Sequence, residues 1–347
     1  MKGTQPSSTS TNNSKALIEE VLELTPVLGT GPDNFTNVKP LWRPPGNRGI
    51  FGGIVIAQTL VAAQKTVAPD FPVRSMHCYF VFAGDGEVPI LYHVERLVDT
   101  TEYVVRSVSA KQGDRLIFSA TLSFTKFDEN NAGRVDYSVP PPAVEKPADV
   151  GSGWDSGQPF QLVTASFDRT FAKPEIKKFR QWALSRGKIS SSGGQQAHLG
   201  ALAYLTDSFL LGTVYRAHLV RRFSSPTAMQ RLQHVKSQPE PDMEALQYFQ
   251  ALADIEKRDL GGNYQTDKEV GMMVSLSHSI YFHNPAVVRA DDWLLSEMET
   301  PWAGDGRGMV VSRWWSSDGV LIATCVQEGV MRMNESKTLQ NSREGKL

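Results

Sequence analysis

The chain has 347 residues, of which 36 are basic and 37 acidic, and its net charge is −1. A balanced charge gives no electrostatic footprint for nucleic acid, and no apolar run approaches the ~18–20 residues of a membrane helix, so we expect neither a nucleic-acid partner nor a membrane span. The length allows one large domain or two smaller ones, each with its own core.

Residues 1–29 are predicted to form a flexible tail, since the first 15 (MKGTQPSSTSTNNSK) are polar. They contain neither the apolar segment of a secretory signal nor the arginines of a mitochondrial transit peptide. Cys78 and Cys325 lie far apart and outside metal-ligand spacing. We expect both to be small buried residues in a reducing compartment.

Residues 30–130 are predicted to form a first folded unit. An apolar helix over 51–63 precedes a series of strands. The strands are predicted at 75–80, 89–97, 102–111 and 115–127. Alternation on the last of them puts Leu122 on a continuous apolar face. One long helix followed by antiparallel strands indicates an α+β fold, with the sheet wrapped around the helix.

Residues 131–180 are predicted to be a linker, because proline, glycine and serine are frequent there (SVPPPAVEKP, GSGWDSGQP). Residues 181–335 then repeat the first unit, and 336–347 form a polar tail. Two pairs of segments carry the repeat: GDRLIFS (113–119) with DGVLIAT (318–324), and SMHCYF (75–80) with SHSIYF (277–282). The chain is therefore predicted to be a tandem pair of similar units.

The second unit is predicted to contain a helix over 199–212 and three hairpin strands. These strands are placed at 293–300, 307–315 and 319–332. An insertion of about 213–266 separates the helix from the first strand, and EPDMEALQYFQALADIEKR within it has apolar residues at helical spacing. We interpret this segment as a surface helix; a lid over a binding site is the alternative.

The differences between the units are informative. Alignment places Gln327 where the first unit has Leu122, and Asp207 where it has Gln58. Gln327 lies in the middle of an apolar strand, where an unpaired amide costs about 1–3 kcal/mol, so it should have a partner. Alternation puts Val274 on the apolar face of the 273–283 strand and Ser275 on the polar face. Polar residues in one unit only predict one active site rather than two.

Each of these residues also has a structural interpretation. Asp207 could cap a helix or face solvent, Ser275 could be polar surface, and Gln327 could be a satisfied core amide. Three histidines suggest a metal site, but two of them are five residues apart on one strand and should face opposite sides. The histidines are His77, His278 and His283. We expect no metal ion and no cofactor.

Six segments resemble the type II, TesB-like acyl-CoA thioesterases, a family that includes the peroxisomal acyl-coenzyme A thioester hydrolases. They are FGGIVIAQTLVAAQ, PILYHVERLVD, LAYLTDSFLL, VSLSHSIYFHNP, ETPWAGDGRG and DGVLIATCVQEGVMR, and the resemblance spans residues 30–335. It implies a double hotdog fold, with each helix wrapped by an antiparallel sheet. It also implies a catalytic Asp on the second helix, a Ser or Thr on the next strand and a Gln near the end: Asp207, Ser275 and Gln327.

The implied activity is hydrolysis of an acyl-CoA thioester to a fatty acid and CoA. Asp207 would act as general base on a water that Ser275 and Gln327 orient; attack by Asp207 as a nucleophile is an alternative. No G-x-S-x-G nucleophile elbow occurs in the chain. Two further alternatives are a hotdog enoyl-CoA hydratase or dehydratase, and a non-catalytic acyl-CoA-binding module.

The chain departs from the family pattern at Ser277-His278-Ser279, where Asp-His-Ser is usual, and in the length of the insertion.

The last three residues, Gly345-Lys346-Leu347, differ by one residue from the peroxisomal signal Ser-Lys-Leu. We therefore expect recognition by the peroxisomal import receptor, with a cytoplasmic location as the alternative. Because hotdog proteins commonly associate, we also expect a homo-oligomer.

Overall fold

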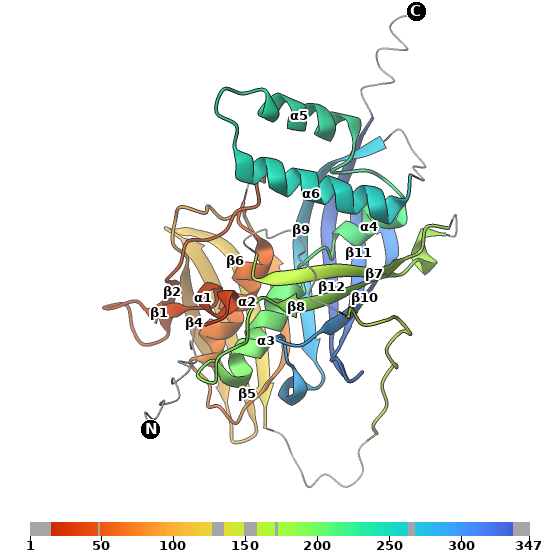
Figure 1. The fold of residues 1–347 in the computed structure, drawn as a ribbon. Coiled ribbons are helices and arrows are strands. Elements are labelled where there is room, and N and C mark those ends of the chain that lie inside the picture. The colour runs from red at the N-terminus through yellow and green to blue at the C-terminus, as the bar shows by residue number, and fades with distance from the viewer. Residues whose placement is uncertain are drawn as a thin grey trace, which may run out of the picture.

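A computed structural model describes residues 15–47, 49–126, 135–148, 158–170, 173–262 and 268–335. In this part of the chain one antiparallel sheet of twelve strands runs through the molecule, in the order β1-β2-β4-β5-β6-β3-β9-β12-β11-β10-β8-β7 (Figure 1). The predicted C-terminal tail, with residues 345–347, lies outside the described residues.

The elements have the following bounds. The strands of the first unit are β1 Leu24–Pro26, β2 Asn34–Asn37, β3 Val73–Phe80, β4 Leu91–Asp99, β5 Tyr103–Gln112 and β6 Arg115–Thr125. The later strands are β7 Phe160–Phe167, β8 Phe179–Ser185, β9 Lys268–Phe282, β10 Leu294–Gly304, β11 Arg307–Trp315 and β12 Leu321–Glu335. The helices are α1 Leu17–Val21, α2 Gly52–Gln64, α3 Gly194–Leu205, α4 Gly212–Ala217, α5 Pro226–Lys236 and α6 Met243–Leu260, with 3-10 turns at Pro174–Ile176 and Pro285–Val287.

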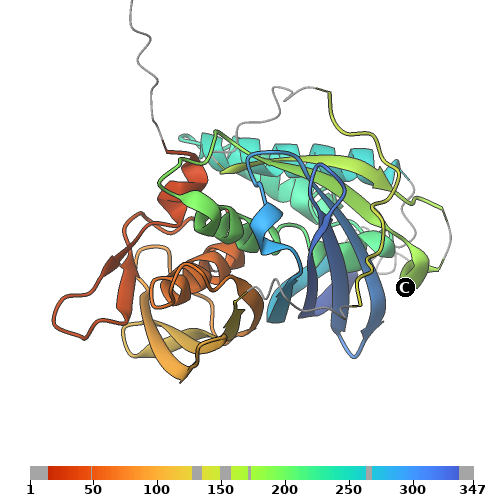
Figure 2. The same cartoon turned by 90° about the horizontal axis from the view of Figure 1, so that it is seen from below.

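The two units have the predicted α+β arrangement, and an antiparallel seam between β3 and β9 joins their sheets. The seam is symmetric: His77 pairs with Ser279, and on either side Ser75 pairs with Tyr281 and Tyr79 with Ser277. Repeat-equivalent residues therefore face each other across a pseudo-twofold axis. Figure 2 shows α2 and α3 packed side by side within the curve of the sheet. Their contact buries apolar residues of both helices in one continuous core.

The same β-bulge interrupts the first long strand of each unit. In β9 the register passes from Ser277 opposite Glu328 to Ser275 opposite Gly329, which leaves Leu276 unpaired. In β3 it passes from Ser75 opposite Ser123 to Val73 opposite Phe124. A bulge inserts one residue and so reverses the alternation of side chains beyond it.

This bulge corrects the predicted faces of the strand. Strict alternation placed Val274 on the core face and Ser275 on the polar face, but Val274 is 50% exposed. Ser275 instead lies on the same side as Gln327, with which it forms a hydrogen bond. A single-residue insertion in the ladder has no signature in an alternating sequence, which is why the prediction was wrong there.

The second helix is also shorter than predicted. It ends at Leu205, so Asp207 lies in the following turn rather than within a helix, and Phe209 in the same turn has a positive φ of 58°. The hydroxyl of Thr206 lies 2.8 Å from the Ala203 carbonyl, just as the hydroxyl of Thr66 lies 2.8 Å from the Ala63 carbonyl at the end of α2. The two threonines are thus equivalent. Gln58 lies inside α2 and is not the counterpart of Asp207.

Two segments predicted to be unstructured are partly ordered. The predicted flexible tail contains α1 and β1, and Glu19 of α1 is buried and accepts a hydrogen bond from the Ser190 backbone N–H at 2.9 Å. The predicted linker contains β7 and the start of β8. Its residues 135–148 also pack on the second unit, where the Trp182 indole donates to the Glu145 carbonyl at 2.8 Å. The composition of this segment predicted that it is proline-rich and irregular. It did not predict that tryptophan side chains of the second unit bind the segment.

The predicted surface helix of the insertion is confirmed as α6 (Figure 1). It reaches the first unit, where Tyr248 packs edge-on against Trp42 with 6.0 Å between ring centroids. Its Glu256 is fully buried and accepts hydrogen bonds from the backbone N–H groups of residues 222–224. These hydrogen bonds fix the turn before α5. No helix among the described residues is long and apolar enough to cross a membrane.

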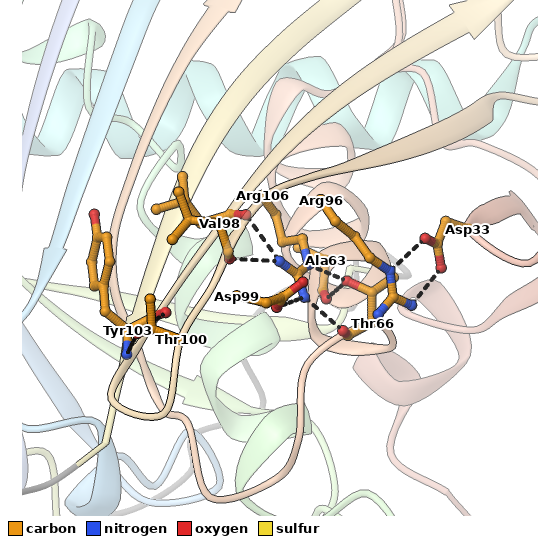
Figure 3. Close-up of polar contacts among 10 residues, drawn as sticks. Asp33, Ala63, Thr66, Arg96, Val98, Asp99, Thr100, Tyr103 and Arg106 are labelled. Carbon is orange, nitrogen blue, oxygen red and sulfur yellow. Dashed lines mark hydrogen bonds and ion pairs between the residues drawn. The ribbon is translucent and has the colours of Figure 1, made fainter.

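The buried Arg106 of β5 fixes the end of α2. Its guanidinium donates to the Thr66 hydroxyl at 2.9 Å and the Thr66 carbonyl at 3.0 Å, to the carbonyls of Val98 and Val105, and to the Asp99 carboxylate at 2.6 Å (Figure 3). Only 1% of Arg106 is exposed, whereas half of the Asp99 side chain is exposed. The carbonyl contacts therefore matter more than the partly solvated ion pair.

We predict that Arg106→Met lowers the free energy of unfolding by about 3–5 kcal/mol, because it leaves buried carbonyls without a donor. The matched variant Asp99→Asn should cost no more than about 1 kcal/mol, since the guanidinium keeps its other partners. Denaturant unfolding measures both values. Equal losses in the two variants would show instead that the ion pair carries the stabilisation.

Candidate active site

Asp207 lies at the interface of the two units. The turn after α3 directs its carboxylate at the N-terminus of α2, where the backbone N–H of Gly53 donates a hydrogen bond to it. A Cβ atom on Gly52 would lie 2.8 Å from Oδ2 of Asp207, and one on Gly53 would lie 2.5 Å from the Tyr204 carbonyl. Only glycines allow this approach. The partial positive charge of the α2 N-terminus favours a carboxylate there.

The Gln327 side chain connects the three predicted residues. Its Nε2 donates to Oδ1 of Asp207 at 2.9 Å and to Oγ of Ser275 at 2.6 Å. The three groups come from the turn after α3, from β9 and from β12, and Gln327 itself is fully buried. The structure therefore brings together all three side chains that the sequence singled out. The partner that the buried amide requires is Asp207 together with Ser275.

The environment of Asp207 alters its protonation. Burial raises the pKa of the carboxyl group from 3.8 to about 7, although the hydrogen bonds from Gln327 and Gly53 lower it. Residue 207 as a whole is half-buried, and its carboxyl group is enclosed by protein. A carboxyl group with a pKa near 7 can accept and release a proton at neutral pH, as general acid–base catalysis requires.

His278 lies behind Gln327 as its cross-strand partner and is fully buried. Its Nε2 is 3.0 Å from the Thr206 hydroxyl, and burial lowers the pKa of the imidazole to about 4 despite a smaller opposing effect of Gln327. The imidazole is therefore neutral. From the sequence alone, a role for this histidine was expected only in a metal site. Its place opposite Gln327 could have been found by extending the repeat alignment to strand pairing.

Two other sequence-based questions have structural answers. Ser277, which stands where the family usually has Asp, pairs with Glu328 and lies on the opposite face of β9 from His278. The departure is thus outside the hydrogen-bond network of Gln327. In the described part of the chain, no group of three or more His, Cys, Asp or Glu side chains is arranged to hold a metal ion.

The three equivalent side chains in the first unit are apolar. Leu122 pairs with Met76 as Gln327 pairs with His278, and Val73 occupies the position of Ser275 beside the shared bulge. Val67 follows Thr66 as Asp207 follows Thr206. A cavity of about 60 Å³ lies beside Val67 and Val73, and Gln64, Gln195 and Gln196 also line it. The geometry is thus present twice, but the polar groups are present once, which supports a single active site.

Comparison with known proteins places these features in a family. Residues 39–125 match the acyl-CoA thioesterase N-terminal domain, and residues 138–331 match the C-terminal domain. The rat protein acyl-coenzyme A thioesterase 8 is 32% identical over 348 residues, which covers 92% of each chain. The yeast peroxisomal acyl-coenzyme A thioester hydrolase 1 is 36% identical over 107 residues, covering 31% of this chain and 30% of the yeast protein.

The fold is similar to that of solved thioesterases. The crystal structure of acyl-CoA thioesterase II TesB2 from Mycobacterium marinum superposes with a TM-score of 0.65 at 25% identity, and covers 91% of this chain and 97% of the other. Together with the matches over both domains, these findings show that the chain belongs to the acyl-CoA thioesterase II family, with a tandem hotdog fold.

Proposed function

We propose that this protein hydrolyses acyl-CoA thioesters to a free fatty acid and CoA, with Asp207 as the general base. The observation that supports this role is the Gln327 amide, which binds Asp207 and Ser275 at once. A water molecule beside these groups would be held between an acceptor carboxylate and a hydroxyl. Its position would be fixed before the substrate carbonyl arrives, which reduces the entropic cost of attack.

In the proposed step, Asp207 takes a proton from water while the water oxygen bonds to the thioester carbonyl carbon. The tetrahedral intermediate then collapses, the C–S bond breaks, and the CoA thiolate receives the proton from the Asp207 carboxyl group. Asp207 thus ends the cycle ionised, as it began. A pKa of about 7 lets the carboxylate accept the proton and return it without a large energetic penalty in either direction.

The N-terminus of α2 supplies the electrostatic complement. The first turn of this helix, at Gly52 and Gly53, lies beside Asp207. We assign stabilisation of the developing oxyanion to backbone N–H groups at this end of α2, where a helix concentrates partial positive charge. Because α2 belongs to the first unit and the polar side chains to the second, both units contribute to the proposed reaction.

We predict that wild-type protein releases thiol from members of an acyl-CoA series from C2 to C20, and that Asp207→Asn reduces kcat by about 10²–10⁴-fold, since the amide cannot accept the proton. Thiol release measures the rate. The exposed Asp114→Asn, in the turn between β5 and β6, serves as the matched control and should keep wild-type activity.

Other outcomes would point to the alternatives. A folded wild type that releases no thiol from any chain length would contradict thioester hydrolysis. Loss of enoyl absorbance with an enoyl-CoA would then indicate a hydratase, and saturable binding without turnover would indicate a binding module. Full activity in Asp207→Asn would retain the reaction but remove Asp207 from the role of base.

The raised pKa of Asp207 predicts the pH profile. General-base catalysis requires the ionised carboxylate, so kcat/KM should rise with pH and reach half its plateau near pH 7. An ordinary aspartate, with a pKa of about 3.9, would give a flat profile over this range. Initial rates from pH 5 to 9 test the prediction. Gln327→Leu should move the midpoint to higher pH, because its hydrogen bond lowers the pKa of Asp207.

We also propose a peroxisomal location, supported by the relative in yeast whose name describes it as peroxisomal. The reaction fits a compartment that oxidises fatty acyl-CoA. A fluorescent protein fused to the N-terminus should co-localise with a peroxisomal marker. Diffuse fluorescence throughout the cytoplasm would contradict this location without affecting the proposed chemistry.

A further inference from the structure

The fully buried Gln327 has one side-chain atom whose function the proposed reaction leaves unexplained. Its Nε2 binds Asp207 and Ser275, but its Oε1 has no hydrogen-bond partner among the described residues. The same holds for Nδ1 of the fully buried His278. Gln327 and His278 face each other as cross-strand partners of β12 and β9. Two orphaned atoms on adjacent side chains indicate an interaction between them, since isolated buried polar atoms are costly.

Hydrogen accounting then fixes the orientation of each group. An ionised Asp207 accepts hydrogen bonds only, so the amide must turn its NH₂ toward Asp207 and its oxygen toward His278. The oxygen requires a donor, which a neutral imidazole can supply if its proton is on Nδ1. Nε2 is then an acceptor, so the Thr206 hydroxyl, which lies 3.0 Å from Nε2 and 2.8 Å from the Ala203 carbonyl, must direct its single hydrogen at Nε2.

We propose that His278 is a positioning residue: held by Thr206, it donates from Nδ1 to Gln327 and so keeps the amide NH₂ directed at Asp207 and Ser275. This inference rests on the proposed role of Gln327 in catalysis. Without the histidine, the amide can rotate by 180° and present its oxygen to the Asp207 carboxylate. That orientation is repulsive and releases both Asp207 and Ser275.

The first unit provides an internal comparison. At the positions of His278 and Gln327 it has Met76 and Leu122, both fully buried. The equivalent threonine, Thr66, is retained but accepts a hydrogen bond from Arg106 instead. The histidine therefore accompanies the glutamine and is absent where the glutamine is absent. The pair of Met76 and Leu122 occupies the same cross-strand positions and needs no hydrogen-bond partners, because both side chains are apolar.

Other groups that pack against His278 leave the imidazole free for this role. Cys78 of β3 contacts the His278 backbone carbonyl at 3.1 Å rather than the ring. Among the described residues, the Asp207 carboxylate is hydrogen-bonded to Gln327 and not to the imidazole. Because His278 has no exposed surface, bound substrate would not contact it. Its effect should therefore fall on turnover and not on substrate binding.

The experiment is a double-mutant cycle with His278→Met and Gln327→Leu, measured as kcat and KM for an acyl-CoA that the wild type hydrolyses. Both substitutions copy the first unit, so the double variant should fold. We expect His278→Met alone to lower kcat by about 10–100-fold with KM changed less than about twofold, and to have less than about a twofold effect in the Gln327→Leu background. His278→Asn, whose amide can still donate toward Gln327, should recover part of the loss.

His77→Met is the matched control, because His77 lies on the exposed face of the same seam and should keep wild-type kcat. A wild-type kcat in His278→Met would overturn the inference, and so would the same fold-loss in both backgrounds. If His278→Met does not fold, folded His278→Asn takes its place in the test. A His278→Asn variant with no more activity than Gln327→Leu would then overturn the inference. An inactive wild type would instead reject the proposed function itself.

Discussion

The arrangement depends on the antiparallel pairing of β3 with β9. This seam joins two half-sheets into one sheet and relates the units by a pseudo-twofold axis through His77 and Ser279. Once the sheets are joined, α2 and α3 must pack against each other inside the curve. The N-terminus of α2 then meets the turn that follows α3, and this contact places Gly53 beside Asp207. Neither unit alone would contain that contact.

The two units share geometry but differ in chemistry. Both contain the bulge in the first long strand and the threonine at the end of the helix, and both have three side chains at equivalent positions beside these features. In the first unit these side chains are Val67, Val73 and Leu122. In the second they are Asp207, Ser275 and Gln327. The two units therefore share the backbone features at this position. The difference in their side chains determines that only the second unit has polar groups there.

Maintaining polar groups in this position has a cost. Burial raises the pKa of Asp207 to about 7, which means that the ionised form is destabilised relative to water. The amide of Gln327, the backbone N–H of Gly53 and the partial charge of α2 offset part of that cost. They leave a carboxylate that is stable enough to exist at neutral pH and basic enough to take a proton from water.

The sequence by itself determined the α+β class and the tandem repeat, and it singled out the three residues that the structure brings together. Apolar periodicity and self-similarity are local properties, and a lone Gln327 opposite Leu122 is visible as a break in them. The sequence did not reveal the bulge at Leu276, the end of α3 before Asp207, the ordered strands β7 and β8, or the neighbours Gly53 and His278.

Tertiary structure decided these features because each depends on pairing between distant segments. Strict alternation placed Ser275 on the wrong face, since an extra residue in a ladder is defined only by the partner strand. Gly53 and Asp207 meet only after two helices from different units pack together. The sequence thus determined which groups are available, and the β3–β9 seam decided which of them meet, because contact across a pseudo-twofold interface cannot be read from either repeat alone.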